Sequence, residues 1–299
     1  MDLFHHRIVL PTNHQTVTII PFACIHADED GHHEELWEEC VKTIERTPLC
    51  LGIGMGDYLT LARSHYRNHI RAYRNDEDSQ KQLDRLVKDR LEDFNRKYLR
   101  RIKHKLIGLA EGNHRWEFLN GTTSTQYLCE LAEVPYLGFA SGHRLQFVHR
   151  SGHPLQVLKM IVHHGDWSGG GMTTGGDINS LERRAEGWNA DIVIAAHTHR
   201  KWGIPVPIMD FPAKGELKVV ERPRAYIRAG CFVRGYVPGC VTYAERKLMK
   251  PTALGWVTLR IQFLQPYDPR KYRQSIEAGA NPQTASHRSE MVYRMRVEY

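Results

Sequence analysis

The stretch TIIPFACIHADED, residues 18 to 30, joins an apolar run to a polar end. The run from Val17 to Phe22 predicts a buried β-strand, and Cys24 and His26 follow it two positions apart. Alternate residues of a strand point to the same side, so a thiol and an imidazole would face one way where the strand ends. Taken alone, this pair fits a buried thiol beside an ordinary histidine better than it fits a metal site.

Comparable apolar runs recur along the chain, and each stops at glycine or polar residues. They predict further strands at 49–55, 105–111, 155–164, 190–197, 225–236 and 253–264, with amphipathic helices at 34–46 and 79–105. Strands that alternate with helices favour an α/β fold whose functional sites lie at the strand ends. The polar stretch 272–299 is expected to be a loosely held extension of one domain that spans 1–299.

Composition narrows the class of protein. The 299 residues are 41% hydrophobic and 25% charged, which is typical of globular proteins. No apolar run reaches the roughly 20 residues that span a bilayer, and the first residues do not resemble a signal peptide. Six scattered cysteines without a CxxC motif indicate reduced thiols, so we expect a cytoplasmic protein with no membrane partner. The net charge of +7 favours an anionic partner.

Groups that can bind metal follow five of the predicted strands in turn. Their imidazole, carboxylate, amide and thiol groups suit borderline cations such as Zn²⁺, Mn²⁺ and Fe. Since the carboxyl ends of strands in an α/β sheet lie side by side, these side chains are expected to converge. The candidates are Cys24, His26, Asp57, Asn113, His114, His164, His197 and His199.

These motifs resemble those of the calcineurin-like metallophosphoesterases. That family has D-x-H, G-D, G-N-H-[DE], H and G-H-x-H, and this chain has C-I-H, G-D, G-N-H-R, H-H-G and A-H-T-H in the same order within residues 16 to 200. Residues 163–200 also look like a subgroup found in phage and prokaryotic genomes. The resemblance implies a layered β-sheet sandwich flanked by helices, of the α/β/β/α type.

The resemblance also implies a site for two divalent metal ions, taken as Mn, Zn or Fe. Cys24, His26, Asp57 and His199 would hold one metal, and Asp57, Asn113, His164 and His197 the other, with Asp57 as the bridge. His164 is preferred over His163 because it directly precedes Gly165. Two such metals can brace both the attacking and the leaving oxygen of an in-line displacement at phosphorus. By the same resemblance, His114 would be a catalytic group that stabilises the phosphoryl oxygens or protonates the leaving group.

The chain departs from the family pattern at three positions. Cys24 stands in place of an aspartate, Arg115 in place of an acid, and Ala196 in place of a glycine. A thiolate can replace a carboxylate as a ligand, and the alternative is a neutral cysteine beside a weakened metal position. Arg115 is a candidate contact to a substrate phosphate, with a surface arginine as the equally open alternative.

The substrate is inferred from residues 60–74, which include Arg63 and Arg67 with tyrosines between the basic residues. Such a pattern suits a phosphodiester backbone with stacked bases, although a solvated amphipathic helix fits it as well. We therefore expect a phosphodiesterase or nuclease acting on DNA, RNA or a nucleotide. The alternatives are a phosphomonoesterase on small molecules or phosphoproteins, and a nucleic-acid-binding module that has lost catalysis. The glycine-rich residues 168–176 are expected to form a mobile loop that closes over substrate.

Overall fold

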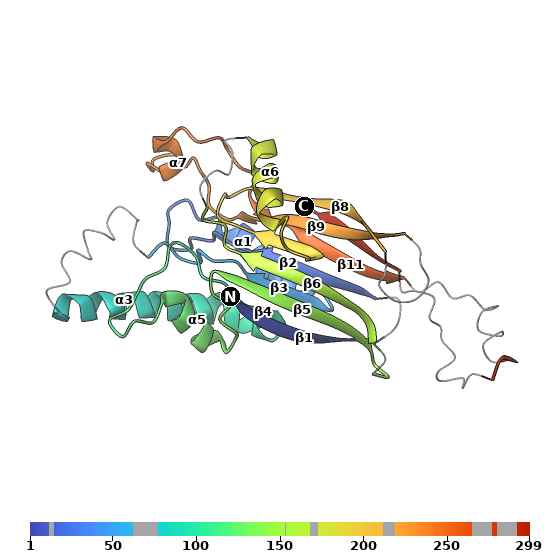
Figure 1. The fold of residues 1–299 in the computed structure, drawn as a ribbon. Coiled ribbons are helices and arrows are strands. Elements are labelled where there is room, and N and C mark those ends of the chain that lie inside the picture. The colour runs from blue at the N-terminus through green and yellow to red at the C-terminus, as the bar shows by residue number, and fades with distance from the viewer. Residues whose placement is uncertain are drawn as a thin grey trace.

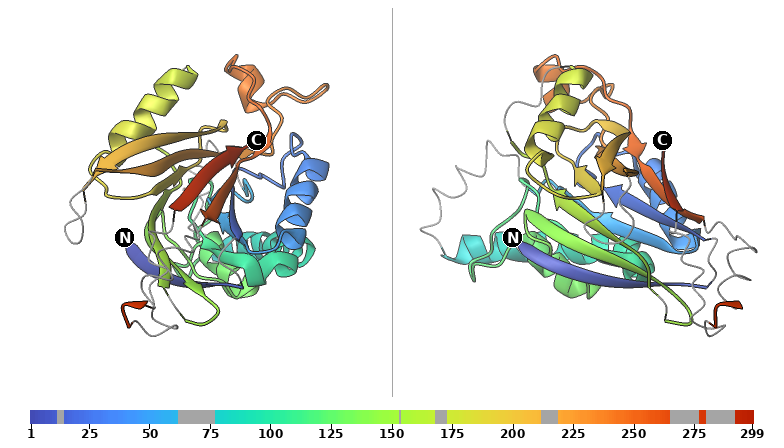
Figure 2. Two further views of the ribbon diagram at one scale, coloured as in Figure 1. Left: turned by 90° about the vertical axis from the view of Figure 1, so that its right-hand side faces the viewer. Right: turned by 45° about the vertical axis from the view of Figure 1, so that its right-hand side comes forward.

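The computed structural model describes residues 1–11, 15–61, 77–152, 154–167, 173–211, 219–264, 277–279 and 292–299. Within them, two β-sheets pack face to face, and helices cover the outer faces (Figures 1 and 2). No helix among the described residues is both long enough and apolar enough to span a bilayer.

The larger sheet has seven strands among the described residues, in the order β1-β5-β6-β7-β9-β10, with β8 paired to β9. β6, β7 and β9 are parallel, whereas β5 runs antiparallel to β6. The strands are β1 (Asp2–Leu10), β5 (Ala140–His149), β6 (Pro154–His163), β7 (Ile192–Ala195), β8 (Lys201–Asp210), β9 (Val220–Cys231) and β10 (Gly255–Trp256).

The smaller sheet has five described strands in the order β12-β11-β2-β3-β4. β2, β3 and β4 are parallel, and their continuous apolar character reflects burial on both faces. The strands are β2 (Thr16–Phe22), β3 (Cys50–Gly54), β4 (Leu106–Leu109), β11 (Thr258–Leu264) and β12 (Val292–Glu298).

Three hydrophobic layers hold these elements together. The central layer lies between the sheets, where Ile19 and Leu259 of one sheet face Leu145 and Ile194 of the other. A second layer packs α1 (Glu34–Arg46), α3 (Glu77–Phe94) and α5 (Ser124–Ala132) against the five-stranded sheet. A third packs α6 (Thr174–Ala185) against the seven-stranded sheet. This helix–sheet–sheet–helix arrangement confirms the expected α/β/β/α class.

The predicted elements are largely present, with corrections. The predicted helix at 79–105 is helical from α3 onward, but it passes through a π-helical turn, η1 (Asn95–Leu99), a short α4 (Arg100–Ile102) and a 3-10 turn, η2 (Lys103–Lys105). The polar extension is not wholly loose, because β12 pairs with β11 along its length. β1, β5, β8, α5, α6 and the short α7 (Tyr243–Arg246) were not predicted.

Both sheets direct the ends of their parallel strands toward the same edge of the sandwich. β2, β3 and β4 of one sheet end there, as do β6, β7 and β9 of the other. A backbone hydrogen bond of 3.1 Å from Phe232 to the carbonyl of Cys24 joins the two sheets at this edge. The candidate metal ligands therefore come from two sheets rather than from the single sheet that strand alternation suggested.

Candidate metal centre

The turns that follow β2 and β3 are hydrogen-bonded to each other. The amides of Ile25 and His26 both donate to the carbonyl of Asp57, at 2.9 and 3.1 Å, and Cys24 donates to Gly56 at 3.0 Å. In the other sheet, Ala196 donates to the carbonyl of His164 at 2.8 Å. These backbone bonds fix the turns that carry the candidate ligands relative to one another within each sheet.

The backbone of the candidate ligands is unusual. Nine non-glycine residues with positive φ occur in the described ranges, and five of them are candidate ligands. A positive φ costs a residue with a side chain roughly 1–3 kcal/mol, and such strain tends to gather at functional sites. The five are Cys24 (49°), His26 (45°), Asp57 (56°), His197 (70°) and His199 (57°). The fold therefore maintains several strained turns at this edge of the sandwich.

Three overlapping groups of side chains place their ligand atoms within 4.8 Å of one another. Asp57 belongs to two of the groups and His26 also belongs to two, so the groups form one continuous cluster. The groups are Cys24, His26 and His199; His26, Asp57 and His114; and Asp57, His164 and His197. Each sequence-predicted imidazole, thiol and carboxylate ligand is thus present in the cluster.

His164 faces oxygen atoms from both of its ring nitrogens. Its Nδ1 lies 2.6 Å from the carbonyl of Met55, which can only accept, so Nδ1 carries a proton. Its Nε2 then faces Asp57 Oδ2 at 3.1 Å and Asn113 Oδ1 at 2.9 Å. If Nε2 is not protonated, its lone pair faces the lone pairs of two oxygens and is repelled by them. A proton on Nε2, or a cation between the three atoms, removes this repulsion. Burial opposes protonation, yet Asp57 outweighs it and raises the pKa of His164.

The other charges suit a cation. Burial lowers the pKa of His26 well below its usual value and that of His199 to about 4, and it also lowers the pKa of His197, so these rings are neutral at pH 7. Burial alone would raise the pKa of Asp57, but the surrounding imidazoles, His164 first, hold it well below its ordinary range. One carboxylate among neutral imidazoles is a donor set that Zn²⁺, Mn²⁺ and Fe accept.

His26 shows most directly that the residues fit a metal. Thr60 Oγ1 donates to Glu29 Oε1 at 2.7 Å, so its oxygen is left to accept a hydrogen bond from His26 Nδ1–H, also at 2.7 Å. The opposite atom, Nε2, is buried and has no hydrogen-bond partner among the described residues. Metal-binding histidines usually donate a hydrogen bond from their other ring N–H in this way, which fixes the tautomer and orients the free lone pair toward the metal.

Replacing Thr60 with valine is expected to weaken metal binding by about 10- to 100-fold, because the tautomer and orientation of His26 lose their support. Titration of the purified protein with Zn²⁺ against a competing chelator measures this. Thr60→Ser keeps the hydroxyl and is the matched control, with affinity close to wild type. Equal affinity for both variants would remove Thr60 from the site.

Cys24 is fully buried, with its Sγ in one cluster with His26 and His199. Burial raises the pKa of the Cys24 thiol well above its usual value, so the thiol becomes a thiolate only with a cation beside it. Such a position suits a ligand whose ionisation depends on the metal, and ligation by Cys24 itself stays a prediction.

Ligation by Cys24 predicts different results for two substitutions. Cys24→Ser should lose metal, whereas Cys24→Asp should keep two metals and shift the preference from Zn²⁺ toward Mn²⁺, because a carboxylate is a harder ligand than a thiolate. Elemental analysis and activity with each metal test this. Wild-type metal content in Cys24→Ser would show that Cys24 is a bystander.

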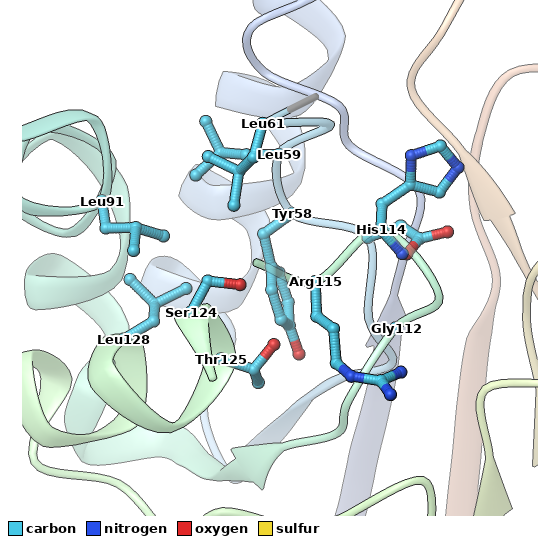
Figure 3. A pocket seen from close by; sticks show the side chains of 11 residues that line it. Tyr58, Leu59, Leu61, Leu91, Gly112, His114, Arg115, Ser124, Thr125 and Leu128 are labelled. Atoms are coloured by element: carbon cyan, nitrogen blue, oxygen red, sulfur yellow. The ribbon is translucent and has the colours of Figure 1, made fainter. Parts of the chain in front are cut away.

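His114 and Arg115 line a small pocket that Asp57 of the cluster also lines (Figure 3). The amide of His114 donates to Asp57 Oδ1 at 2.9 Å, and its half-buried ring meets that of His26 edge-on, 4.8 Å between centroids. The Arg115 guanidinium lies 5.0 Å from the centre of the Phe139 ring. The far side of the pocket is apolar and includes the side chains of Leu59, Leu61, Leu91 and Leu128.

The side chains of His163 and His164 lie in two different environments. His164 is buried in the cluster, whereas His163 accepts a hydrogen bond from the amide of Gly165 at 2.7 Å and packs on Trp167, 4.9 Å between ring centroids. Neighbouring residues of a strand point to opposite faces, which accounts for the difference. The structure therefore brings His164, and not His163, toward Asp57.

Other predictions fall outside or beside the site. Arg63 and Arg67 lie outside the described residues, as does the first part of the predicted glycine-rich loop, 168–172. The rest of that loop is not a loop, because Thr173 caps α6 and 174–176 form its first turn. The mobile lid therefore stays a prediction for the undescribed part and is wrong for 174–176.

Sequence reasoning missed the groups that support the cluster. Asp28 accepts from the amides of Thr60 and Leu61 at 2.6 and 2.8 Å, and Glu29 supports His26 through Thr60. Both acids belong to the quoted stretch, immediately after His26, and an acidic run beside a candidate ligand was the available signal.

No family model matches the chain, and no curated protein matches it either. Among solved structures, a conserved uncharacterized protein of Streptococcus pneumoniae TIGR4, named as a predicted phosphoesterase, is 13% identical, with 85% of this chain and 86% of that chain covered and a TM-score of 0.32. Vacuolar protein sorting 29 (Vps29) from Cryptosporidium parvum is 9% identical, with 95% and 98% covered and a TM-score of 0.35.

A zinc complex of Vps29 from Entamoeba histolytica is 11% identical, with 46% of this chain and 67% of that chain covered and a TM-score of 0.18. The phage and prokaryotic subgroup stays a prediction. Likenesses this weak do not identify a reaction, which has to come from the side chains of this chain.

Proposed function

We propose that the chain is a metal-dependent phosphoesterase that holds two divalent cations where its two sheets meet. The observation that carries this proposal is the cluster around Asp57, in which the turns that follow β2, β4, β6 and β7 bring imidazoles, a thiol and an amide together with the one buried carboxylate that follows β3. A cation satisfies the facing lone pairs of Asp57, Asn113 and a neutral His164 together, in the place that a proton on His164 Nε2 takes when no metal is bound.

The ligand groups divide around Asp57. Cys24, His26 and His199 form one group, which shares His26 with a group that includes Asp57. Asp57 also groups with His164 and His197, whose rings both lie 2.9 Å from Asn113 Oδ1. A carboxylate has two oxygens and can face a cation with each, which supports Asp57 as the bridging ligand.

When bound, two divalent cations would lower the pKa of a water molecule, which makes a hydroxide nucleophile available at neutral pH, and would offset the charge of the phosphoryl group. The chain itself contributes position and protonation. Asp57 stays ionised, and the half-buried His114 beside it is placed to hydrogen-bond a phosphoryl oxygen or to protonate the leaving oxygen.

For the substrate, we propose a phosphodiester of a nucleic acid or nucleotide. The net charge of +7 and the cationic Arg115 that lines the pocket support this choice. The departures Cys24 and Arg115 favour, as the second candidate, a weakened enzyme that keeps a metal and binds nucleic acid. All six cysteines are free thiols, which supports a reducing, cytoplasmic location.

Hydrolysis of bis-p-nitrophenyl phosphate and p-nitrophenyl phosphate, with Mn²⁺ or Zn²⁺ added, tests the proposal. We expect the diester to be cleaved faster, with all activity lost in the presence of a chelator. Faster cleavage of the monoester would identify a phosphomonoesterase instead. Stable metal binding without cleavage of either compound would support the binding module.

A further inference from the structure

An arginine lies where the pattern of β9 calls for an apolar residue. Arg228 is fully buried between the buried Ile227 and Ala229, and it is paired in register with Ala195 of β7 and Trp202 of β8. A buried charge is strongly unfavourable unless it is paired and hydrogen-bonded. Its place in the middle of the sheet therefore calls for a specific set of partners.

The partner of Arg228 is Asp177, in the first turn of α6 and also fully buried. Arg228 Nη2 donates to Asp177 Oδ1 at 2.9 Å. The other carboxylate oxygen accepts from Trp202 Nε1 at 2.8 Å. The pair is thus closed off from solvent, and the two opposite charges neutralise each other, although Arg228 Nε has no hydrogen-bond partner among the described residues.

The same guanidinium holds the turn that carries His197. The amide of Thr198 donates to the carbonyl of Ala196 at 2.8 Å, and His197 between them has a φ of 70°. A bond between residues two apart with positive φ at the centre defines the rare, strained form of the γ-turn. Arg228 Nη1 donates to that same Ala196 carbonyl at 2.7 Å, so a second hydrogen bond holds the carbonyl that closes the turn.

The guanidinium also lies against the turn that follows His164. A Cβ added at Gly165 would stand 2.8 Å from Arg228 Nη1 and 2.9 Å from the carbonyl of Ala196. The centre of the Trp167 ring, two residues further along the chain than Gly165, lies 5.0 Å from the guanidinium carbon. Arg228 therefore contacts both turns that supply imidazoles from the seven-stranded sheet.

We propose that Arg228 and Asp177 are positioning residues, which hold the His197 turn in its strained form and so set the affinity for metal. This inference rests on the metal centre proposed above. Direct contact with a substrate phosphate does not fit, because the guanidinium is fully buried and already neutralised by Asp177.

The test compares Zn²⁺ and Mn²⁺ affinity, by chelator competition, with the thermal unfolding of the metal-free protein. Arg228→Met combined with Asp177→Asn removes both charges and keeps an acceptor for Trp202, so it limits the loss of stability. We expect it to bind metal about 10- to 100-fold more weakly than wild type, the range typical of groups that orient ligands. Arg228→Lys keeps the charge and is expected to recover part of this affinity.

The matched control is Arg222→Met. Arg222 pairs with the buried Asp191 at 2.9 Å, at the opposite end of β7 from His197. It should lower stability and leave metal affinity unchanged. Wild-type affinity in the Arg228→Met/Asp177→Asn variant, or in Arg228→Met alone if the pair fails to fold, would overturn the inference. A raised KM for bis-p-nitrophenyl phosphate at unchanged metal affinity would do so too, because it would place Arg228 on the substrate. A wild-type protein that binds no metal would instead overturn the metal centre itself.

Discussion

Asp57→Asn is expected to release most of the bound metal and to lower kcat/KM by about 10³-fold or more. Asp57 is the one carboxylate in the cluster of ligand atoms among the described residues, and it belongs to two of the three groups. An amide keeps the shape but removes the charge that two cations would share. Elemental analysis and bis-p-nitrophenyl phosphate hydrolysis, on the same preparation, measure the two effects.

The control for this substitution is Asp191→Asn. Asp191 is also a buried aspartate, but it pairs with Arg222 and the amide of Lys159, away from the ligand turns. It should cost stability and leave metal content unchanged. Full turnover of Asp57→Asn with both metals retained would exclude Asp57 as the bridge.

His114→Ala is expected to keep its metals and to lose about 10²- to 10⁴-fold in kcat, the effect typical of a missing acid–base group. His114 lines the pocket, and its backbone amide, which alanine retains, donates to Asp57 Oδ1 at 2.9 Å. Metal content and steady-state kinetics on the diester separate the two roles.

His163→Ala is the matched control for His114, because His163 is a nearby imidazole that packs on Trp167 instead of joining the cluster. Its activity should stay within about tenfold of wild type. Loss of metal from His114→Ala would mean that His114 is a ligand, in the group it forms with His26 and Asp57.

Much of the fold follows from local pattern. The apolar runs that became β2, β3, β4 and β7 are buried on both faces and are followed by glycine or polar residues, which is a strong signal. β1 and β12 gave no such signal, because they lie at sheet edges and alternate exposed with buried residues. Tertiary pairing, and not local propensity, decides such strands.

The site was predictable where a residue type has few other uses. Imidazoles and Asp57 directly after buried strands indicated convergence, and the structure brings them together. Arg228, Asp177 and Thr60 could not be found in this way, since each acts through a partner distant in sequence. Their roles depend on how the two sheets and α6 pack, which local spacing does not encode.

The most direct test of the two-metal centre is a crystal structure of the protein soaked in Mn²⁺, with anomalous scattering recorded to locate the metal. We predict two peaks about 3.5–4 Å apart, one on each side of the Asp57 carboxylate. One peak should lie against His26 and His199, and the other against His164 and His197. A single peak, or no peak within reach of Asp57, would contradict the two-metal centre.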